Sequence, residues 1–511
     1  MKPDRVGLLF LLASSTVMGA EGPPQRLLIE PSLQTNLLAT DNSHIGTSTP
    51  AAKDLILGVT PRLRVVGRGA RLRVDADVSV QALHYTRGTL DDTAFARGRA
   101  AAAIELVERW VHLDVSAEAD QSGADPFALQ QGSSTSTSLD LTTRRYRLSP
   151  YVEHQWSPTL SMLARSDNLW TRRSGDAAAG LTRRDSLDQQ NVVRFERRPV
   201  PLGVAFEVAS QRSKYAEQDN SALNSDTARL IASYAVTPEL IVGVSGGRER
   251  SRFGAQQDAE SDSVYGPRVA WRPTERTDLN VVAEHRFFGW GGTLEAKHRS
   301  PFLAISARAE RLPAAQPSSL LIGPVGGNLA SLLDAAFTTR YPDPAQRDAV
   351  VRDLIASRNL PATISGPIDV FPNYVQLRQL TSLNATFLGR VTTVSIGGYI
   401  GRSTQLLRED SPYVPSPTTN ADNRQEGFSV DLSRRTSGVT TLSARLSKSR
   451  IEGIGVRDGD VSSETSLTLT VNYALGPKTT LAGGVRHRAF DSNVNSSSRE
   501  NAVFLGTTHR F

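Results

Sequence analysis

The chain has 511 residues, of which 39% are hydrophobic and 22% charged, so it can bury a large apolar surface and does not resemble a disordered protein. Its formal net charge is +6, from 58 basic and 52 acidic residues, and this excess is too small to indicate a nucleic-acid partner. The sequence contains no cysteine, which excludes disulfides, thiolate metal sites and a lipid anchor on cysteine.

The first residues resemble a secretory signal peptide. Lys2 and Arg5 form a basic start, which is followed by an apolar stretch and then by small residues up to Ala20. We expect residues 1–20 to be removed on export and residues 21–511 to form the mature protein. No later apolar run reaches about 18 residues, so a mature protein that spans a membrane would have to do so with strands.

Apolar and polar residues alternate along several segments, as in strands that separate lipid from an aqueous lumen. In residues 466–475 leucine, valine and tyrosine occupy the odd positions, and serine, threonine and asparagine most of the even ones. Residues 71–82, 428–433 and 442–447 alternate in the same way. A soluble β-sandwich would alternate too, so the connections between strands must decide between the two folds.

The predicted connections alternate between tight turns and long polar loops. Tight turns are predicted near residues 156–158 and 476–478, and longer loops near 121–138, 216–225 and 407–423. Short periplasmic turns opposite longer outer loops are typical of outer-membrane barrels. The sequence therefore predicts an all-β fold, a transmembrane antiparallel β-barrel of about 22 strands, within a range of about 20 to 24.

The charged residues of these segments fall on the polar side of each strand. A charge that faces lipid at mid-bilayer costs about 2–4 kcal/mol, so the apolar neighbours direct these residues into the lumen. Such charges commonly pair across strands, and rows of arginine could also steer an acidic polysaccharide or another anion. The predicted lumen-facing residues are Arg73, Asp75, Asp77, Glu284, Arg286, Asp431 and Arg445.

The C-terminal residues form the last predicted strand. Val503, Leu505 and Phe511 share one face, and the terminal phenylalanine resembles the signal that the barrel-insertion machinery reads in outer-membrane proteins. We therefore expect this machinery and the lipid of the outer membrane as partners, and the outer membrane of a Gram-negative bacterium as the location of the mature protein.

Residues 313–369 interrupt the pattern and are too long for a hairpin loop. Asp343 suits the N-cap and Pro344 the first position of a helix, and a second helix is expected from Leu329 to Thr339. We expect this helical insert on the extracellular side, where it would either cap the mouth of the barrel or fold into the lumen as a plug.

No motif of a soluble enzyme stands in a suitable context. The glycine-rich segment 243–247 lies in a predicted strand, and the 8 histidines are dispersed along the chain. We therefore predict no catalytic residue, no metal site and no cofactor.

Residues 265–289, YGPRVAWRPTERTDLNVVAEHRFFG, resemble the PEP-CTERM system-associated outer-membrane proteins, a family of Gram-negative bacteria that also carry exosortase and exopolysaccharide genes. Residues 149–156, 234–240 and 342–361 resemble the same family. The resemblance implies an outer-membrane barrel linked to exopolysaccharide production or to the sorting of surface proteins, with exopolysaccharide or PEP-CTERM export components as partners. It implies no known activity and no particular functional residue.

These features together predict a barrel that is not an enzyme and that exports, assembles or anchors a surface polymer or a sorted protein through a charged lumen. Residues 313–369 would gate or block that lumen. One alternative is a general diffusion porin, and another is an outer-membrane lipase or polysaccharide hydrolase. A TonB-dependent transporter is not expected, because little of the chain precedes the first predicted strand.

Overall fold

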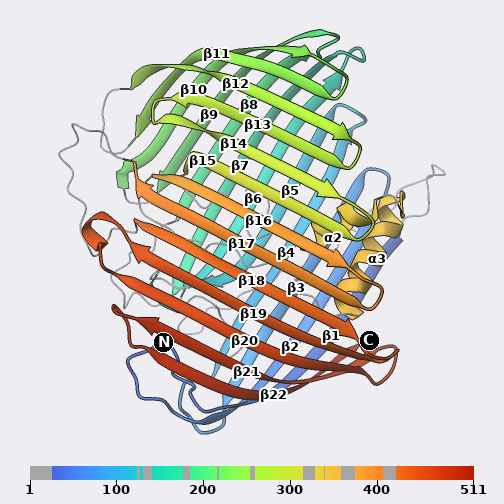
Figure 1. The fold of residues 1–511 in the computed structure, drawn as a ribbon, viewed down its shortest axis with the longest axis vertical. Helices are drawn as coiled ribbons and strands as arrows, with labels where there is room; N and C mark the ends of the chain where they lie inside the picture. The colour runs from blue at the N-terminus through green and yellow to red at the C-terminus, as the bar shows by residue number, and fades with distance from the viewer. Residues whose placement is uncertain are drawn as a thin grey trace.

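The computed structural model describes residues 26–122, 127–129, 141–175, 185–215, 218–253, 259–314, 329–338, 340–357, 375–406 and 422–511. In this part of the chain, 22 antiparallel strands form one sheet in which each strand pairs with the next along the sequence. The first strand also pairs with the last, from Ser32 opposite Arg510 to Thr40 opposite Ala502, and this pairing closes the sheet into a barrel. Figure 1 shows the later strands as a front wall over the earlier ones.

The first eleven strands are β1 (Arg26–Thr40), β2 (Asp54–Arg68), β3 (Leu72–Tyr85), β4 (Thr93–Val107), β5 (Val111–Ser122), β6 (Leu141–Gln155), β7 (Leu160–Gly175), β8 (Ser186–Arg197), β9 (Leu202–Tyr215), β10 (Gln218–Ala235) and β11 (Leu240–Phe253). The others are β12 (Glu260–Thr274), β13 (Thr277–Arg286), β14 (Gly289–Arg299), β15 (Leu303–Ala314), β16 (Gln376–Leu388), β17 (Thr392–Gln405), β18 (Asn423–Arg435), β19 (Thr440–Gly453), β20 (Val461–Ala474), β21 (Thr479–Ser492) and β22 (Ser498–Arg510). The predicted 22-stranded barrel is confirmed.

Short connections gather at one end of the barrel and most long connections at the other. Residues 69–71 and 475–478 are examples at the short-turn end, and residues 41–53 at the long-loop end, where a short 3-10 helix, η2 (Gly455–Arg457), also lies. Phe287 and Phe288 alone join β13 to β14 at that end. Because periplasmic turns are short in such barrels, the short-turn end faces the periplasm.

The prediction of a loop at residues 216–225 is wrong for most of that segment, because β10 already begins at Gln218. From Leu223 onward this strand pairs without a break with both β9 and β11. The sequence of this segment, AEQDNSALNS, is mostly polar and lacks the regular alternation by which the other strands were recognised. A strand that projects beyond the lipid contacts water on both sides and needs no apolar face.

The two faces of the wall differ in polarity in the way that a lipid-embedded barrel requires. In β16 the polar residues Ser382, Asn384 and Thr386 are buried in the barrel interior, whereas Leu383 and Phe387 are exposed on the outside. The outward residues of β20, which alternate with threonines, are exposed leucine and valine in the same way. A soluble protein buries such apolar side chains, so this outer face matches hydrocarbon and not water.

Exposed aromatic side chains mark both ends of the apolar band. Trp156 and Trp271 lie next to short turns, and Tyr265 and Trp290 lie toward the long-loop end. Tyr265 also stacks on His285 of the neighbouring strand, with ring centroids 5.1 Å apart. Aromatic residues favour the boundary between lipid and water, so these two belts delimit the membrane.

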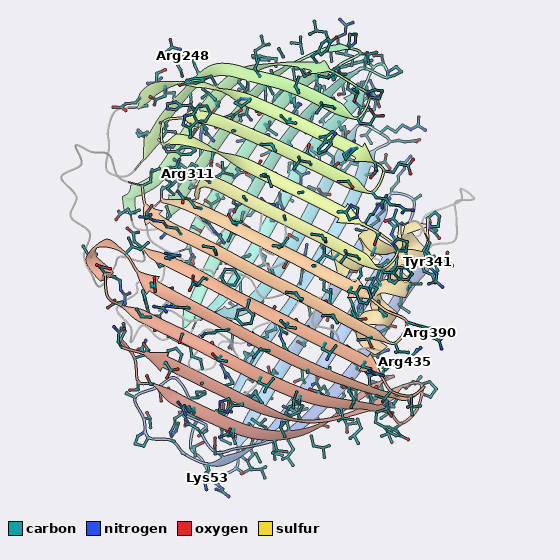
Figure 2. All side chains as sticks on the ribbon, viewed as in Figure 1. Lys53, Arg248, Arg311, Tyr341, Arg390 and Arg435 are labelled. Carbon is teal, nitrogen blue, oxygen red and sulfur yellow. The ribbon has the colours of Figure 1, made fainter. Side chains whose placement is uncertain are left out.

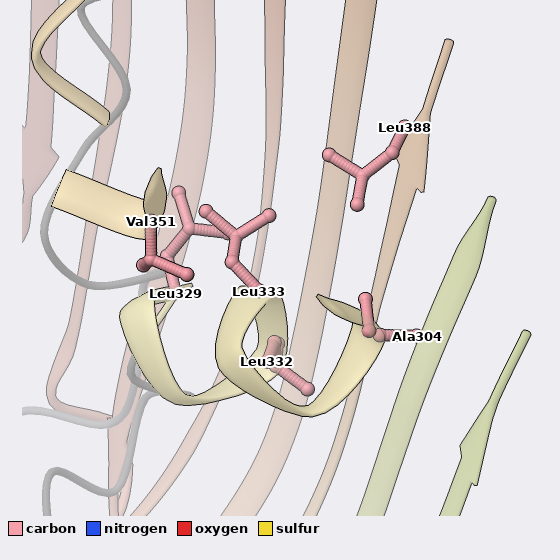
Figure 3. Close-up of a cluster of buried hydrophobic side chains, with 7 residues drawn as sticks. Ala304, Leu329, Leu332, Leu333, Val351 and Leu388 are labelled. Carbon is pink, nitrogen blue, oxygen red and sulfur yellow. The ribbon is translucent and has the colours of Figure 1, made fainter. Parts of the chain in front are cut away.

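The described helices, α2 (Leu329–Phe337) and α3 (Pro344–Ser357), start at the residues that the sequence predicted. Leucines of α2 pack on Val351 of α3 and on Ala304 and Leu388 of the wall (Figure 3). These two wall residues face the lumen, since each belongs to the same strand face as the buried polar residues. The helices therefore lie inside the barrel.

Their depth differs from the expected extracellular position. Strands β15 and β16 reach the long-loop end at Ala314 and Gln376, but α2 packs near Ala304 and Leu388, at the short-turn end. Figure 1 places both helices at the same end as the C-terminus. At that depth the apolar side chains of α2 are buried against Ala304 and Leu388. Within the described residues, no helix has the length and apolar character needed to cross a membrane.

Candidate functional site

The predicted residues Arg73, Asp75 and Asp77 lie on the lumen face of β3. Asp77 forms an ion pair with Arg62 of the neighbouring strand β2. Arg73 and Asp75 line a lumen cavity of about 670 Å³, which Asp343, at the start of α3, also lines. This group of charges therefore faces the inserted helices.

The predicted residue Glu284 lies at the centre of a network that joins four strands. It accepts hydrogen bonds from Arg229 Nη1 at 2.6 Å, Arg268 Nη2 at 2.5 Å and Ser245 Oγ at 2.9 Å. Arg229 also pairs with Glu207 of β9. The carboxylate of Glu284 is almost fully buried, so its charge is balanced by the two guanidinium groups and not by water.

Two local features of β12 let these strands approach. A side chain at Gly266 would come within 1.9 Å of the Ala283 carbonyl oxygen, so only glycine fits there. The ladder between β12 and β13 runs from Tyr265 to Arg268 without a pair at Pro267, which has no backbone N–H to donate. The pairing of β12 with β13 is thus interrupted at Pro267, next to the Glu284 network.

The remaining predicted lumen residues form separate pairs. Arg286 Nε donates to Glu249 Oε2 at 2.9 Å, and Ser225 donates to the same carboxylate. Arg445 Nε lies 3.4 Å from Asp431 Oδ1, directly across from it on the neighbouring strand. The seven predicted residues therefore belong to different parts of the wall and do not form one site.

Sequence reasoning missed most of the partners in these networks, including Glu207, Arg229, Glu249 and Arg268. An arginine and a carboxylate two positions apart share a strand face, as in Arg308-x-Glu310, and this spacing could have revealed some of the lumen charges. Partners on other strands could not be found in this way, because they depend on the register between strands.

In four ion pairs of β11–β19 the arginine is more exposed to the lumen than its carboxylate, although Arg308 is less exposed than its second partner, Glu295. The exposed fractions of the side chains are 0% for Glu249 against 17% for Arg286, 5% for Glu284 against 18% for Arg268, 3% for Glu310 against 20% for Arg308, and 5% for Asp431 against 41% for Arg445. The order is reversed for the pairs Arg97–Asp120 and Arg145–Glu118 of β4–β6. These four pairs thus present guanidinium groups to the lumen, which favours anions.

The helices connect opposite walls of the lumen. On one side α2 packs on β15 and β16, and Arg299 Nη1 donates to the Ala335 carbonyl oxygen at 3.5 Å. On the other side Arg68 Nη2 of β2 lies 2.7 Å from Asp348 Oδ2 of α3. Strand β2 lies far from β15 in both directions around the ring, so the two helices cross the lumen. In Figure 2, Tyr341 lies at the same end of the barrel as Arg390 and Arg435.

The glycine-rich segment and most histidines occupy ordinary strand positions, and His44 lies in the connection between β1 and β2. His298 bonds Thr277, and His509 bonds Thr479. Ser245 of segment 243–247 belongs to the Glu284 network. Within the described ranges, no group of three or more histidine, aspartate or glutamate side chains could hold a metal ion.

The C-terminal strand presents Val503, Leu505 and Phe511 as exposed side chains on the outer surface of the barrel. The backbone N–H of Phe511 donates to the Pro31 carbonyl oxygen at 3.0 Å, across the seam between β22 and β1. Recognition of this strand by the insertion machinery stays a prediction. The predicted signal peptide, residues 1–20, lies outside the described residues.

No protein-family description and no curated protein matches this chain. Among solved structures, it is similar to the FrpB iron transporter from Neisseria meningitidis (F5-1 variant), with 10% identity over 94% of this chain and 82% of that chain and a TM-score of 0.47. It is also similar to OccK2 (OpdF) from Pseudomonas aeruginosa, with 11% identity, 94% and 98% coverage and a TM-score of 0.34. It is similar as well to the siderophore receptor PirA from Pseudomonas aeruginosa, with 10% identity over 94% of this chain and 80% of that chain and a TM-score of 0.36.

In the closed sheet every strand pairs its backbone N–H and C=O groups with two neighbouring strands. The apolar outer band of the sheet lies between two aromatic belts. Its lumen face is polar and charged along the same strands. A barrel with this distribution is stable only when hydrocarbon surrounds it. The protein is therefore an integral β-barrel of the Gram-negative outer membrane.

Proposed function

We propose that the protein is a gated outer-membrane channel for an anionic polymer and that it serves the export of exopolysaccharide. The observation that carries this proposal is the helix pair α2–α3, which crosses the lumen at the periplasmic end between β15–β16 and β2. A segment in this position obstructs passage while it is docked. Cargo can pass only when the helices move.

The contacts that hold the helices are weak enough to open. The side chains of Arg68 and Asp348 are 39% and 34% exposed, and an ion pair of that exposure contributes about 0–1 kcal/mol. On the wall, the buried apolar cover of α2 consists of Ala304 and Leu388. By contrast, the pairs within the wall, such as Glu284 with Arg268, are nearly buried. The gate can therefore move without loss of the barrel.

The charge of the lumen suggests the chemistry of the cargo. In four ion pairs of β11–β19 the guanidinium group is more exposed than its carboxylate, and such a surface attracts uronic-acid or other acidic sugars more than neutral ones. The resemblance of residues 265–289 to PEP-CTERM system-associated proteins supports an exopolysaccharide as cargo and export components as partners. In this proposal the barrel itself carries out no reaction.

Conductance in planar bilayers tests the gate. We expect the whole mature protein to conduct rarely, and a variant in which a short glycine–serine connection replaces residues 315–374 to conduct steadily and to prefer anions in a salt gradient. Arg68→Gln should increase the open probability. Arg62→Gln is the matched control, because Arg62 lies on the same strand but pairs with Asp77 of the wall.

Two results would reject the proposal. Steady conductance of the unaltered protein, equal to that of the shortened variant, would identify a general diffusion porin. A preference for cations in the shortened variant would reject an anionic cargo. In cells, deletion of the gene should reduce extracellular polysaccharide, and restoration with an unaltered gene should recover it; unchanged polysaccharide with altered surface-sorted proteins would move the assignment to protein sorting.

A further inference from the structure

Arginines also line the outside of the barrel at the long-loop end. Arg248 and Arg250 of β11 flank the lumen-facing Glu249, so both project outward, and both are exposed. Figure 2 shows Arg248 and Arg311 toward this end of the barrel, opposite Arg390 and Arg435. The other exposed, outward-facing arginines at this end include Arg144, Arg172, Arg212, Arg402, Arg424 and Arg450.

Some of these arginines stand directly opposite one another on neighbouring strands. Arg402 of β17 pairs in register with Arg424 of β18, and Arg144 of β6 with Arg172 of β7. Like charges in such cross-strand positions are about 5 Å apart at Cβ and repel each other. Among the residues that the structure describes, Arg402 has no carboxylate partner, and Arg424 reaches only Glu426, at 3.9 Å.

The Arg402–Arg424 pair borders a depression of about 620 Å³ on the outer wall. The edge toward the long-loop end is polar, because Arg311, Gln379, Arg402 and Arg424 follow one another in register across four strands. Closer to the middle of the membrane, the lining is mostly apolar and includes Val281, Leu294, Ala309 and Ile400, with the small hydroxyl side chain of Thr381 between the last two.

The row of arginines lies at the membrane boundary. Arg311 is in register with Gly292, two residues from Trp290, whose side chain is exposed in the outer aromatic belt. Arg311 also donates a hydrogen bond to the Trp290 carbonyl oxygen. The depression therefore extends from the headgroup level into the hydrocarbon, on the outer leaflet side.

We propose that this depression binds a phosphorylated lipid of the outer leaflet, with a phosphate group between Arg402 and Arg424 and an acyl chain along Leu294 and Ile400. A phosphate carries the charge that relieves the repulsion between the two guanidinium groups, and it accepts hydrogen bonds from both. The apolar lining below matches an acyl chain. A free anion would leave that lining uncovered, so the lipid is the occupant.

The test measures lipid binding to the purified full-length barrel in detergent by native mass spectrometry. The probes are diphosphorylated lipid A, its dephosphorylated form and inorganic phosphate. We expect the unaltered protein to retain the diphosphorylated lipid. Arg402→Gln/Arg424→Gln should retain it at least about tenfold more weakly. Arg434→Gln should not differ from the unaltered protein, because Arg434 also faces outward on β18 but lies at the short-turn end.

A second measurement separates lipid binding from folding. The double variant should unfold at the same or a higher urea concentration than the unaltered protein in zwitterionic vesicles, and at a lower one once the phosphorylated lipid is added. Equal retention of lipid A by the double variant would overturn the proposal. So would equal binding of the diphosphorylated and the dephosphorylated lipid by the unaltered protein. Thermal stabilisation by inorganic phosphate equal to that by the lipid would also overturn it, in favour of a free anion.

Discussion

Arginines on the two faces of this barrel have opposite neighbours: carboxylates in the lumen and other arginines on the outside. In the lumen, Arg268 and Arg286 lie against buried carboxylates that the chain itself supplies. On the outer face, Arg402 and Arg424 stand opposite each other, and Arg144 stands opposite Arg172. The lumen charges thus contribute to the wall itself, whereas the outer charges depend on what the membrane supplies. Arginine thus stabilises the wall on the lumen face and binds lipid on the outer face.

Loss of a buried lumen carboxylate should have the largest effect. Glu284→Gln leaves the guanidinium group of Arg268 without its counter-charge and removes one of the two carboxylates that bind Arg229, so the free energy of unfolding should fall by about 3–5 kcal/mol. Urea titration of the barrel in lipid vesicles measures this change. Asp75→Asn is the control on the same face, because Asp75 is exposed in the lumen cavity. An equal, small effect of both substitutions would contradict a cohesive role for the network.

A charge placed on the outer face at mid-membrane should have the next largest effect. Leu469→Arg on β20 should lower the free energy of unfolding by about 2–4 kcal/mol, since its side chain meets hydrocarbon. Thr468→Arg, one residue earlier, faces the lumen and should cost much less. The same urea titration compares the two variants, and a reversed order would mean that the faces are wrongly assigned.

The close contact between β12 and β13 should tolerate no side chain. Gly266→Ala places a methyl group against the Ala283 carbonyl oxygen, so it should lower the free energy of unfolding by about 1–3 kcal/mol. Gly246→Ala is the matched control on β11, because nothing lies within 4 Å of a side chain there. If both alanines were neutral by urea titration, the approach of these strands would be looser than described.

The smallest predicted effect has the opposite sign. In zwitterionic vesicles, Arg402→Gln alone should raise the free energy of unfolding by about 0.2–1 kcal/mol, because it removes the repulsion from Arg424. Replicate urea titrations can resolve a change of this size. Destabilisation in those vesicles would indicate a carboxylate partner for Arg402 and would remove the contrast between the two faces.

The alternation of residues was sufficient to predict the barrel, its strand number and the lumen-facing side of β3, β13, β18 and β19. Predicting the networks required more, because Glu284 is bound by residues of β10, β11 and β12 whose registers are set only when the sheet forms. Local capping signals likewise predicted the start of α3 at Pro344. The docking place of the helices was not predictable, since Ala304 has no feature that distinguishes it from other strand alanines.

The seam between β1 and β22 limits how such a chain can change in length during evolution. Loss of a single strand would bring two parallel strands together, so the antiparallel hydrogen bonds on both sides of the lost strand would have to be replaced by parallel ones. An odd number of strands would also place one end of the chain on the opposite side of the membrane. Gain or loss of a whole hairpin keeps the antiparallel order around the ring, so it disturbs this barrel less than gain or loss of a solitary strand.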